Sequence, residues 1–306
     1  MARSKSRGRP VHGVVLVDKP QGMTSHTVVQ RVRKCFQAAR AGHTGALDPL
    51  ATGLLPVCLG EATKFGNVLL ESDKGYEAIA RLGQTTDTGD ADGQVLDTRP
   101  VPLRHEVDLD DLVRRFSGVI EQIPPMYSAL KHKGTPLHKL ARQGVEVERA
   151  PRPVTIHALN LAWVDDERLK VTVRCSKGTY IRVLVEDMGR VLGCGAHVEQ
   201  LRRTEVAGLQ VSEAVPLDVL SECGAPEDYL LPVDTLVQHL PVQVLDSAQK
   251  HSLLHGQPVT ITPRSEAGDV RLYGPGGEFI GLGIAEGAQL RSRRLVSTDY
   301  LQILNL

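Results

Sequence analysis

The stretch VTIHALNLAW at residues 154–163, followed by LKVTVRC at residues 169–175, indicates how this chain folds. Both runs are rich in β-branched and apolar residues, and the polar residues Asp165, Asp166 and Glu167 lie between them. Two such runs joined by a short polar turn are typical of a β-hairpin. The hairpin predicts antiparallel strands in the central part of the chain.

Helices and strands are expected on both sides of this hairpin. Apolar spacing predicts a strand at 13–17, a helix that starts at its capping residue Ser25, a strand at 76–82, and helices at 109–116 and 179–192. Helices and hairpins are mixed here without regular β-α-β alternation. The expected fold class is therefore α+β, with a mixed, largely antiparallel sheet and flanking helices.

The last part of the chain differs in character. From about Pro241 the pattern is one of short strands broken by turns such as 274–277, and a basic cluster follows at 291–294. This pattern predicts a small β-rich domain at 241–306 after a catalytic domain at 1–240.

Charge is balanced overall but uneven along the chain. Lys and Arg number 36, as do Asp and Glu, so any affinity for nucleic acid must come from local clusters. Residues 1–40 carry nine Lys or Arg against one acid, Asp18, whereas residues 205–235 carry seven acids and no Lys or Arg. We therefore expect one basic side that binds a polyanion, including a basic N-terminal arm at 1–12.

The cysteines and the N-terminus indicate the cellular compartment. The five cysteines are odd in number, scattered and never spaced as C-x-x-C, so neither a disulfide framework nor a cysteine zinc site is expected. The apolar run from Val14 to Val17 stops at Asp18, too soon for a signal-peptide core or a membrane span. A cytoplasmic protein without membrane contact is expected.

The strongest chemical signal is GHTGALDPLATG at residues 42–53. Its glycines permit tight turns and the close approach of another backbone, and Pro49 biases Asp48 away from helical angles. Asp48 is thus presented from a constrained loop. The alternative is that Asp48 caps a helix starting at Pro49, since Asp at the N-cap and Pro at the next position are both favoured.

This loop resembles the catalytic loop of the TruB pseudouridine synthases, whose G-H-T-G-x-L-D-P-x-A-x-G motif it matches at every fixed position. Other segments resemble further motifs of that family in the same order: 13–20 with 22–25, 74–76, 122–131, 175–182, 192–204 and, in the end domain, 293–295. The likeness therefore covers residues 13 to about 204 and recurs near the end of the chain.

The resemblance implies that uridine 55 in the T loop of tRNA becomes pseudouridine by base flipping, glycosidic bond cleavage and C5–C1′ rejoining. It implies no cofactor and no metal, in keeping with a sequence that lacks a Walker loop or a G-x-G-x-x-G after a strand. The implied partner is the T arm of tRNA. A monomer with no obligatory protein partner and a PUA-like, RNA-binding C-terminal domain is expected.

Three residues receive catalytic roles from the resemblance. The Asp48 carboxylate attacks the sugar carbon or, alternatively, removes a sugar proton. Tyr76 stacks on the target base and deals with the C5 proton, and Arg182 pairs with Asp48. Without the family, Tyr76 is a half-buried aromatic at a strand start and Arg182 an ordinary exposed helix arginine.

Further residues receive substrate-binding roles. By resemblance, His43 stacks against the displaced RNA, and Tyr180 and Leu201 form the remaining walls of the base pocket. Lys19 and the basic segment 126–152 are expected to meet phosphates, the segment as an RNA-binding lid. The alternatives are that His43 is an ordinary surface histidine and that Tyr180 and Leu201 are core residues. Lys19 and the basic residues of 126–152 would then be solvated surface charges.

Two features are discounted as metal sites. Asp87, Asp90 and Asp92 lack the ligand spacing and closing glutamate of a calcium loop, and His251 and His255 lack further zinc ligands. Both are expected at the surface.

Two other classes of function stay open. One is a guide-RNA-dependent catalytic subunit, which normally has longer termini and a fuller RNA-binding end domain. The other is an RNA-folding chaperone without catalysis, which the intact set of Asp48, Tyr76 and Arg182 argues against.

Overall fold

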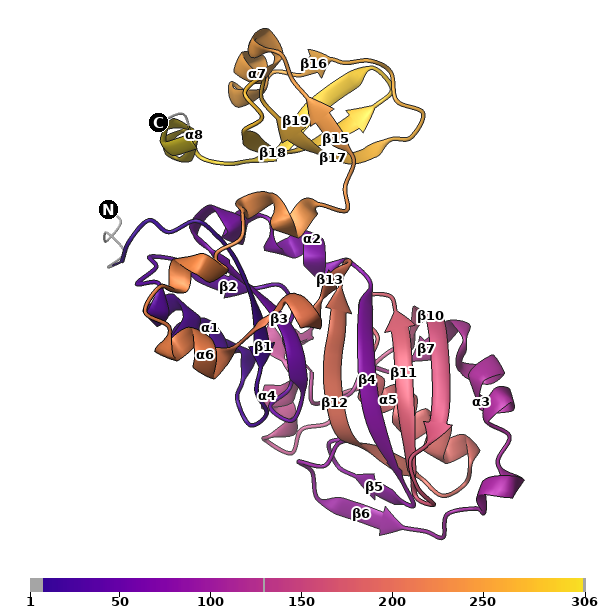
Figure 1. The fold of residues 1–306 in the computed structure, drawn as a ribbon. Coiled ribbons are helices and arrows are strands. Elements are labelled where there is room, and N and C mark those ends of the chain that lie inside the picture. Colours follow the sequence, from indigo (N-terminus) through magenta and orange to yellow (C-terminus); the bar gives the residue numbers. More distant parts are fainter. Residues whose placement is uncertain (1–7, 129, 305–306) are drawn as a thin grey trace.

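The chain folds around one large mixed sheet (Figure 1), seen here in a computed structural model that describes residues 8–128 and 130–304. Eight strands follow one another across this sheet: β14 (Val215–Pro216), β1 (Gly13–Lys19), β3 (Thr52–Leu59), β12 (Ala196–Val206), β4 (Lys74–Leu82), β11 (Arg168–Cys175), β10 (Arg152–Trp163) and β7 (Gly118–Gln122). Two short strands extend it: β2 (Ala41–His43) on β3 and β13 (Leu209–Gln210) on β12.

Helices flank the sheet: α1 (Ser25–Cys35), α2 (Gly66–Leu70), α3 (Leu109–Phe116), α4 (Leu137–Ala141), α5 (Ile181–Val191) and α6 (Leu217–Glu222). Two small hairpins lie outside it: β5 (Gln84–Thr86) with β6 (Val95–Thr98), and β8 (Lys131–His132) with β9 (Thr135–Pro136). The predicted hairpin is the antiparallel pair β10 and β11. In the large sheet most neighbours are antiparallel and two pairs, β1–β14 and β3–β12, are parallel, so the α+β prediction is confirmed.

The sheet has two halves, each with its own core. On one half, α1 and α6 bury side chains such as Val28, Val32 and Leu220 against β1 and β3. On the other, α5 buries Leu184 and Met188 against β4 and β11, behind which it lies in Figure 1. The halves meet where β3 and β12 pair in parallel over only two residues on each strand.

Gly53 makes this junction possible. Its φ is +98°, and a Cβ atom on it would lie 2.3 Å from the backbone oxygen of Arg203 on β12. Only glycine allows both the left-handed backbone and such a close strand approach.

Gly53→Ala is therefore expected to lower the free energy of unfolding by about 3 kcal/mol, because it adds backbone strain and a backbone clash together. Urea denaturation measures this change. Gly224→Ala is the control, since nothing lies within 4 Å of the added carbon there. Equal stability of the two variants would contradict the packing described for the junction.

The start of α1 differs from the prediction. Thr24, not Ser25, is the N-cap, and its hydroxyl accepts a hydrogen bond from the backbone of Thr27. The buried hydroxyl of Ser25 is instead turned toward the 42–53 loop. The cap prediction was thus wrong by one residue, because tertiary contacts engage Ser25 elsewhere.

The C-terminal part forms a second sheet, and the predicted β-rich end of the chain is confirmed. Its strands, in order, are β15 (Val242–Val244), β17 (Gly268–Tyr273), β18 (Phe279–Glu286), β19 (Gln289–Leu295) and β16 (Val259–Thr260), with α7 (Ser247–Leu254) and α8 (Thr298–Leu304) beside them. It has a core of its own and also packs Phe279 edge-on against Phe65, with ring centroids 5.3 Å apart. The backbone N–H of Ser297 donates to Glu61, which fastens the start of α8.

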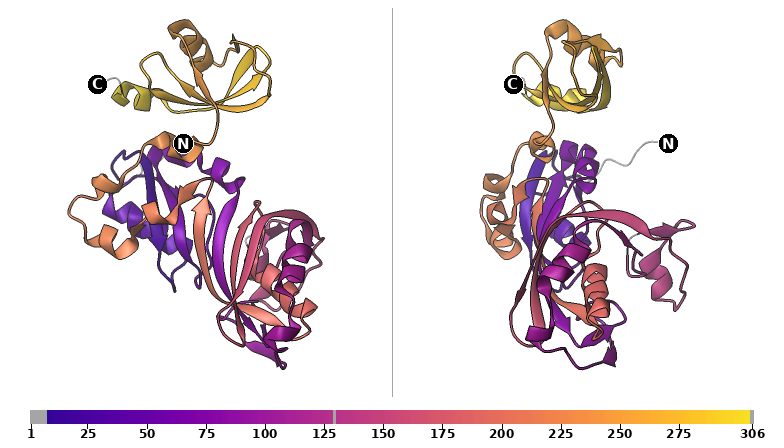
Figure 2. Two further views of the ribbon diagram at one scale, coloured as in Figure 1. Left: turned by 45° about the vertical axis from the view of Figure 1, so that its right-hand side comes forward. Right: turned by 90° about the vertical axis from the view of Figure 1, so that its right-hand side faces the viewer.

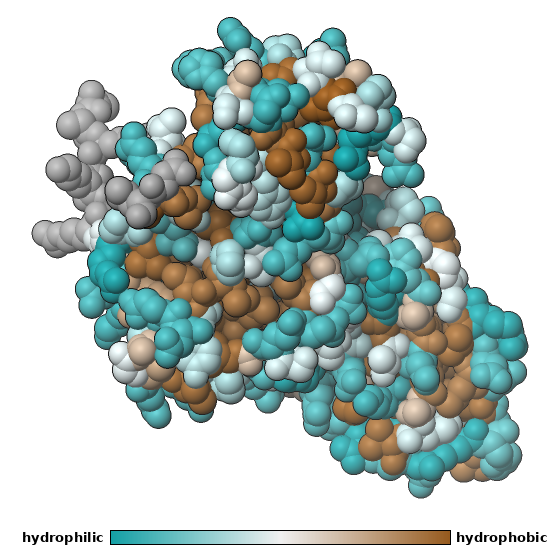
Figure 3. Space-filling model, turned by 45° about the horizontal axis from the view of Figure 1, so that its top comes forward, coloured by the Kyte–Doolittle hydropathy of each residue, from teal (hydrophilic) through white to brown (hydrophobic). Residues whose placement is uncertain are grey.

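Among the described helices, none has the length and apolar character needed to cross a membrane. On the face drawn in Figure 3, hydrophilic and hydrophobic residues are interspersed.

Candidate active site

Asp48 lies in the loop between β2, which ends at His43, and β3, which begins at Thr52. No helix starts at Pro49; the backbone oxygen of Asp48 accepts a hydrogen bond from Ala51 in a single turn before β3. The helix-cap alternative for Asp48 is therefore wrong. Its carboxylate does not cap a helix and stays available for chemistry.

The residues on both sides of Asp48 are held in place. The backbone N–H of Leu47 donates to the Ser25 hydroxyl at 2.7 Å, and this hydroxyl donates to the Leu47 oxygen at 3.0 Å. On the other side, the Lys19 ammonium donates to the backbone oxygens of Pro49, at 3.3 Å, and Pro20, at 2.9 Å. The loop thus presents Asp48 from two fixed neighbours.

The expectation that Lys19 meets a phosphate has to be corrected. Its side chain is fully buried, and burial lowers its pKa to about 8 while the nearby Asp48 charge counteracts that fall. A buried ammonium that already holds two carbonyl oxygens is not exposed to the RNA backbone. Lys19 instead supports the loop and places positive charge near Asp48.

Arg182 on α5 is buried and makes contacts in several directions. One Nη lies 3.0 Å from the Asp48 carboxylate and donates to the backbone oxygen of Tyr127 at 2.7 Å. The other Nη donates to the backbone oxygen of Thr88 at 2.7 Å. Its Nε lies 3.7 Å from Asp90. Such a planar fork, filled by fixed acceptors, leaves the guanidinium one orientation.

The electrostatics of Asp48 are set by opposing influences. Burial raises the pKa of the Asp48 carboxyl, and the negative charges of Asp90 and Asp92 raise it further. The positive charges of Arg182 and Lys19 lower it. Arg182 thus offsets part of the cost of ionising this carboxyl.

Tyr76 and Tyr180 lie near this carboxylate. Burial raises the pKa of both phenols, and the Asp48 charge contributes to each rise. Tyr180 immediately precedes α5, and its backbone N–H and oxygen both bond to the side-chain amide of Gln122. Leu201 on β12 faces Ala78 on β4 and packs against the same two cores as Tyr76. The structure therefore brings together the predicted catalytic residues and two predicted pocket walls.

His43 closes the start of the loop. Its Nδ1 accepts a hydrogen bond from the backbone N–H of Gly45 at 3.2 Å. Burial lowers the pKa of His43, and the charges of Arg203 and His26 lower it further. A neutral, half-buried ring suits stacking better than ion pairing.

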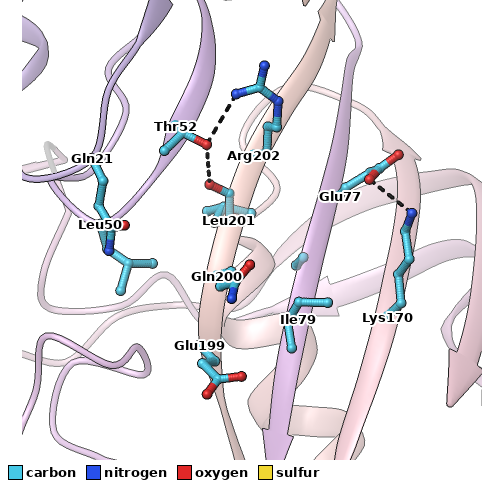
Figure 4. A pocket seen from close by; sticks show the side chains of 11 residues that line it. Gln21, Leu50, Thr52, Glu77, Ile79, Lys170, Glu199, Gln200, Leu201 and Arg202 are labelled. Carbon is cyan, nitrogen blue, oxygen red and sulfur yellow. Dashed lines mark hydrogen bonds and ion pairs between the residues drawn. The ribbon is translucent and has the colours of Figure 1, made fainter. Parts of the chain in front are cut away.

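A cavity of about 530 Å³ opens on the opposite side of the sheet (Figure 4). Glu77, Ala78 and Ile79 of β4 line it together with Lys170, Gln200 and Arg202. Figure 4 shows the Glu77–Lys170 ion pair there, and an N–O distance of 3.0 Å separates their charged groups. Leu201 is the one predicted site residue among those lining this cavity. Asp48, Tyr76 and Arg182 are not among the residues lining this cavity, whereas Leu50 and Thr52 of the 42–53 segment are.

Sequence patterns missed several residues of the site. Asp90 was expected at the surface, but it is buried beside Arg182. Ser25 and Arg203 were not assigned to the site. Ser25 looked like a helix cap and Arg203 is one of two adjacent arginines, so nothing in the nearby sequence indicated their contacts with the 42–53 loop. The expectation for His251 and His255 is met: both are exposed. Among the described residues, no three His, Cys, Asp or Glu side chains gather as a metal site would require.

Family models match nearly the whole chain. A model described as the TruB family pseudouridylate synthase N-terminal domain matches residues 33–181, and one described as the tRNA pseudouridylate synthase B C-terminal domain matches residues 182–238. A third, described as pseudouridine synthase II TruB, C-terminal, matches residues 241–296.

Curated relatives resemble the chain over almost their full length. The protein named tRNA pseudouridine synthase B from Aromatoleum aromaticum is 52% identical, with 95% of this chain and 94% of that protein covered. The proteins of the same name from Coxiella burnetii and Mannheimia succiniciproducens are 50% and 48% identical, over 94% and 97% of this chain and 96% and 100% of theirs.

Solved structures share the fold. A Cbf5-Nop10-Gar1 complex contains a chain with a TM-score of 0.71 at 25% identity, covering 94% of this chain and 86% of that chain. An H/ACA RNP bound to a substrate RNA containing 2′-deoxyuridine gives a TM-score of 0.71 at 23% identity, covering 97% and 92%.

Proposed function

Because this chain belongs to the TruB family of pseudouridylate synthases, we propose that it converts uridine 55 in the T loop of tRNA to pseudouridine. The observation that carries the proposal is the Asp48 carboxylate, held 3.0 Å from the buried Arg182 guanidinium in a loop near Tyr76. This isomerisation needs no group donor, because every atom of the substrate is kept in the product.

The reaction breaks the N1–C1′ bond and forms a C5–C1′ bond, while the proton on C5 is lost and N1 gains one. Asp48 acts on the sugar, either by attack on C1′ or by removal of a sugar proton, and both routes need its ionised form. Arg182 keeps the carboxylate ionised and oriented. Tyr76 stacks on the base and takes up the C5 proton.

A uridine inside the T loop has to leave its stack before Asp48 can act on it. His43 stacks against the RNA from which the base has left, and Tyr180 and Leu201 are walls of the pocket that receives it. Asp48 lies at the floor of this pocket in the proposal.

The segment 126–152 serves as an RNA-binding lid. Figure 2 shows it standing out from the sheet on the side of α5, with the β8–β9 hairpin and α4 at its tip. Arg182, which pairs with the Asp48 carboxylate, also donates to the backbone oxygen of Tyr127 near the start of this segment. Basic residues near the tip are available to phosphates: Lys131, Lys133, Lys139 and Arg142.

The wider organisation belongs to the same proposal. A catalytic domain at 1–240 binds the T arm, and a PUA-like domain at 241–306 adds RNA contacts. The basic arm at 1–12 assists, although its residues 1–7 lie outside the described part of the chain. The protein acts as a monomer in the cytoplasm and needs no protein partner.

The test is to incubate the purified protein with a bare tRNA transcript, without cofactor, and to map pseudouridine chemically. Pseudouridine at position 55 alone is the expected product. An isolated T-arm hairpin is expected to be modified as well, since the pocket reshapes a local loop. Modification that depends on an added guide RNA would overturn the proposal in favour of a ribonucleoprotein subunit.

Surface charge provides a second test. Arg31, Arg33 and Lys34 on α1 are exposed, and no ion pair holds them in the part of the chain that the structure describes. Changing all three to Glu is expected to weaken tRNA binding and to flatten its salt dependence, because fewer counterions are released from the RNA. Filter binding at several salt concentrations measures both effects.

The control reverses Arg114 and Arg115 on α3, which are exposed but already paired with acids of their own helix. That variant is expected to bind tRNA nearly as the wild type does. Single-turnover chemistry at saturating enzyme is expected to survive in both variants. Unchanged affinity in the α1 variant would place the tRNA-binding face elsewhere.

A further inference from the structure

Arg203 on β12 is a buried cation that has no assigned role in the proposed reaction. Its side chain is 1% exposed. No Asp or Glu in the described ranges 8–128 and 130–304 lies within ion-pairing distance of it, and burial lowers the pKa of its guanidinium. An unpaired buried charge is costly, so its position calls for a physical reason.

The first reason is that Arg203 holds the Asp48 loop in place. The Nε of Arg203 donates to the backbone oxygen of Leu54 at 2.8 Å, and one Nη donates to the backbone oxygen of Gly45 at 3.1 Å. Gly45 comes before Asp48 and Leu54 comes after it. The guanidinium therefore links both flanks of the loop.

The second reason is that Arg203 lies next to Tyr76. In the register of β12 and β4, Arg203 lies directly opposite Tyr76, on the same face of the sheet. The Arg203 charge lowers the pKa of Tyr76 against the rise that burial causes. Arg203 is thus bonded to the loop of the catalytic carboxylate and lies opposite the residue assigned to the C5 proton.

We propose that Arg203 is a positioning residue for pseudouridine formation, which fixes the Asp48 loop against Tyr76 and stabilises negative charge on the Tyr76 oxygen while the C5 proton is removed. This inference rests on the proposed function. The C5–H bonding pair returns to the base ring, and the proton passes to the phenolate oxygen of Tyr76. N1, whose bond to the sugar was broken, takes a proton from water, and the Tyr76 phenol returns its proton to water at the end of the turnover, so the isomerisation stays balanced.

A purely structural clamp would need hydrogen-bond donors and no charge. The two accounts therefore differ in what a change of charge at position 203 does to the pH dependence of the rate. Lys19 and Lys74, which lie near Arg203, both have a pKa lowered to about 8 by burial. A lysine at the similarly buried position 203 is expected to lose its charge in the same accessible pH range.

The experiment measures the single-turnover rate of pseudouridine formation in tRNA between about pH 6 and pH 10 for the wild type, Arg203→Gln and Arg203→Lys. Uridine carrying deuterium at C5 is used in parallel. Arg202→Gln is the matched control, because the neighbouring Arg202 lies on the opposite face of β12 and pairs with Asp18. Thermal unfolding and tRNA affinity are measured for each protein.

Arg203→Gln is expected to lower the rate by at least roughly 10²-fold, as loss of a preorganised charged donor does, and to introduce a C5-deuterium isotope effect. Arg203→Lys is expected to retain much of the rate near neutral pH and to lose it as the pH rises through the pKa of the new lysine. Arg202→Gln is expected to stay within about twofold of the wild type.

The Lys variant decides the question even where the Gln variant does not fold. A folded Arg203→Lys protein with the pH profile of the wild type would show that the charge is irrelevant and would overturn the proposal. So would a folded Arg203→Gln protein with a wild-type rate. A wild-type protein that forms no pseudouridine in this assay would instead overturn the proposed function, and this inference with it.

Discussion

Asp48→Asn is expected to cut the single-turnover rate of pseudouridine formation by at least roughly 10⁴-fold, a barrier increase of about 5.5 kcal/mol. The amide keeps the size of the side chain but can neither attack the sugar nor remove its proton. Thermal stability and tRNA affinity are expected to stay near those of the wild type, because Asp48 caps no helix and its backbone turn is retained.

The assay has to exclude slow deamidation of the new Asn to Asp, which would mimic residual activity. Mass spectrometry of the protein before and after the reaction provides this control. A deamidation-free variant that works within tenfold of the wild-type rate would show that the carboxylate is not the reacting group.

Arg182→Gln is expected to have the second largest effect, a fall of roughly 10³-fold in the single-turnover rate near neutral pH. The substitution leaves two carboxylates, Asp48 and Asp90, close together without the cation that lies between them. It also removes donors to the oxygens of Thr88 and Tyr127, so the base of the lid loses an anchor.

The pH dependence of this variant has a definite sign. Arg182 lowers the pKa of Asp48, so its loss raises that pKa further above the ordinary value. Because the reaction needs the ionised carboxyl, the acid limb of the rate profile is expected to move to higher pH, and part of the activity returns as the pH is raised.

Arg190→Gln is the matched control, since Arg190 lies on the same helix, is exposed and pairs with Asp187. It is expected to leave rate and pH profile unchanged. An Arg182→Gln protein that keeps the wild-type acid limb would show that Arg182 does not govern the ionisation of Asp48.

Local patterns in the sequence were enough for the main elements. The strand pattern of the 154–175 hairpin became β10 and β11, and the predicted helix at 109–116 is α3 with the same bounds. Such elements are predictable because alternation and helical spacing depend on neighbours a few residues away. Asp48 itself was identified through a motif within one twelve-residue loop, but its alternative as a helix cap was wrong because β3 pairs with β1 and starts at Thr52.

Roles that depend on distant contacts were not accessible in the same way. Lys19 was expected at a phosphate but is buried against Pro49, and Asp90 was expected at the surface but is buried beside Arg182. Whether a charged side chain is solvated or buried depends on which segments pack over it, and these segments are 30 to 92 residues away in the chain.

The amino-acid sequence alone therefore specified the α+β elements, the basic N-terminal segment and the loop that carries Asp48, because each depends on short-range order. Only the tertiary structure decided which cations lie beside that carboxylate or hold its loop. Arg182 comes from α5, Lys19 from β1 and Arg203 from β12, and the sheet and its covering helix bring them together. Burial then shifts the pKa values of Asp48, Lys19 and Tyr76, since desolvation exists only once the chain is folded around them.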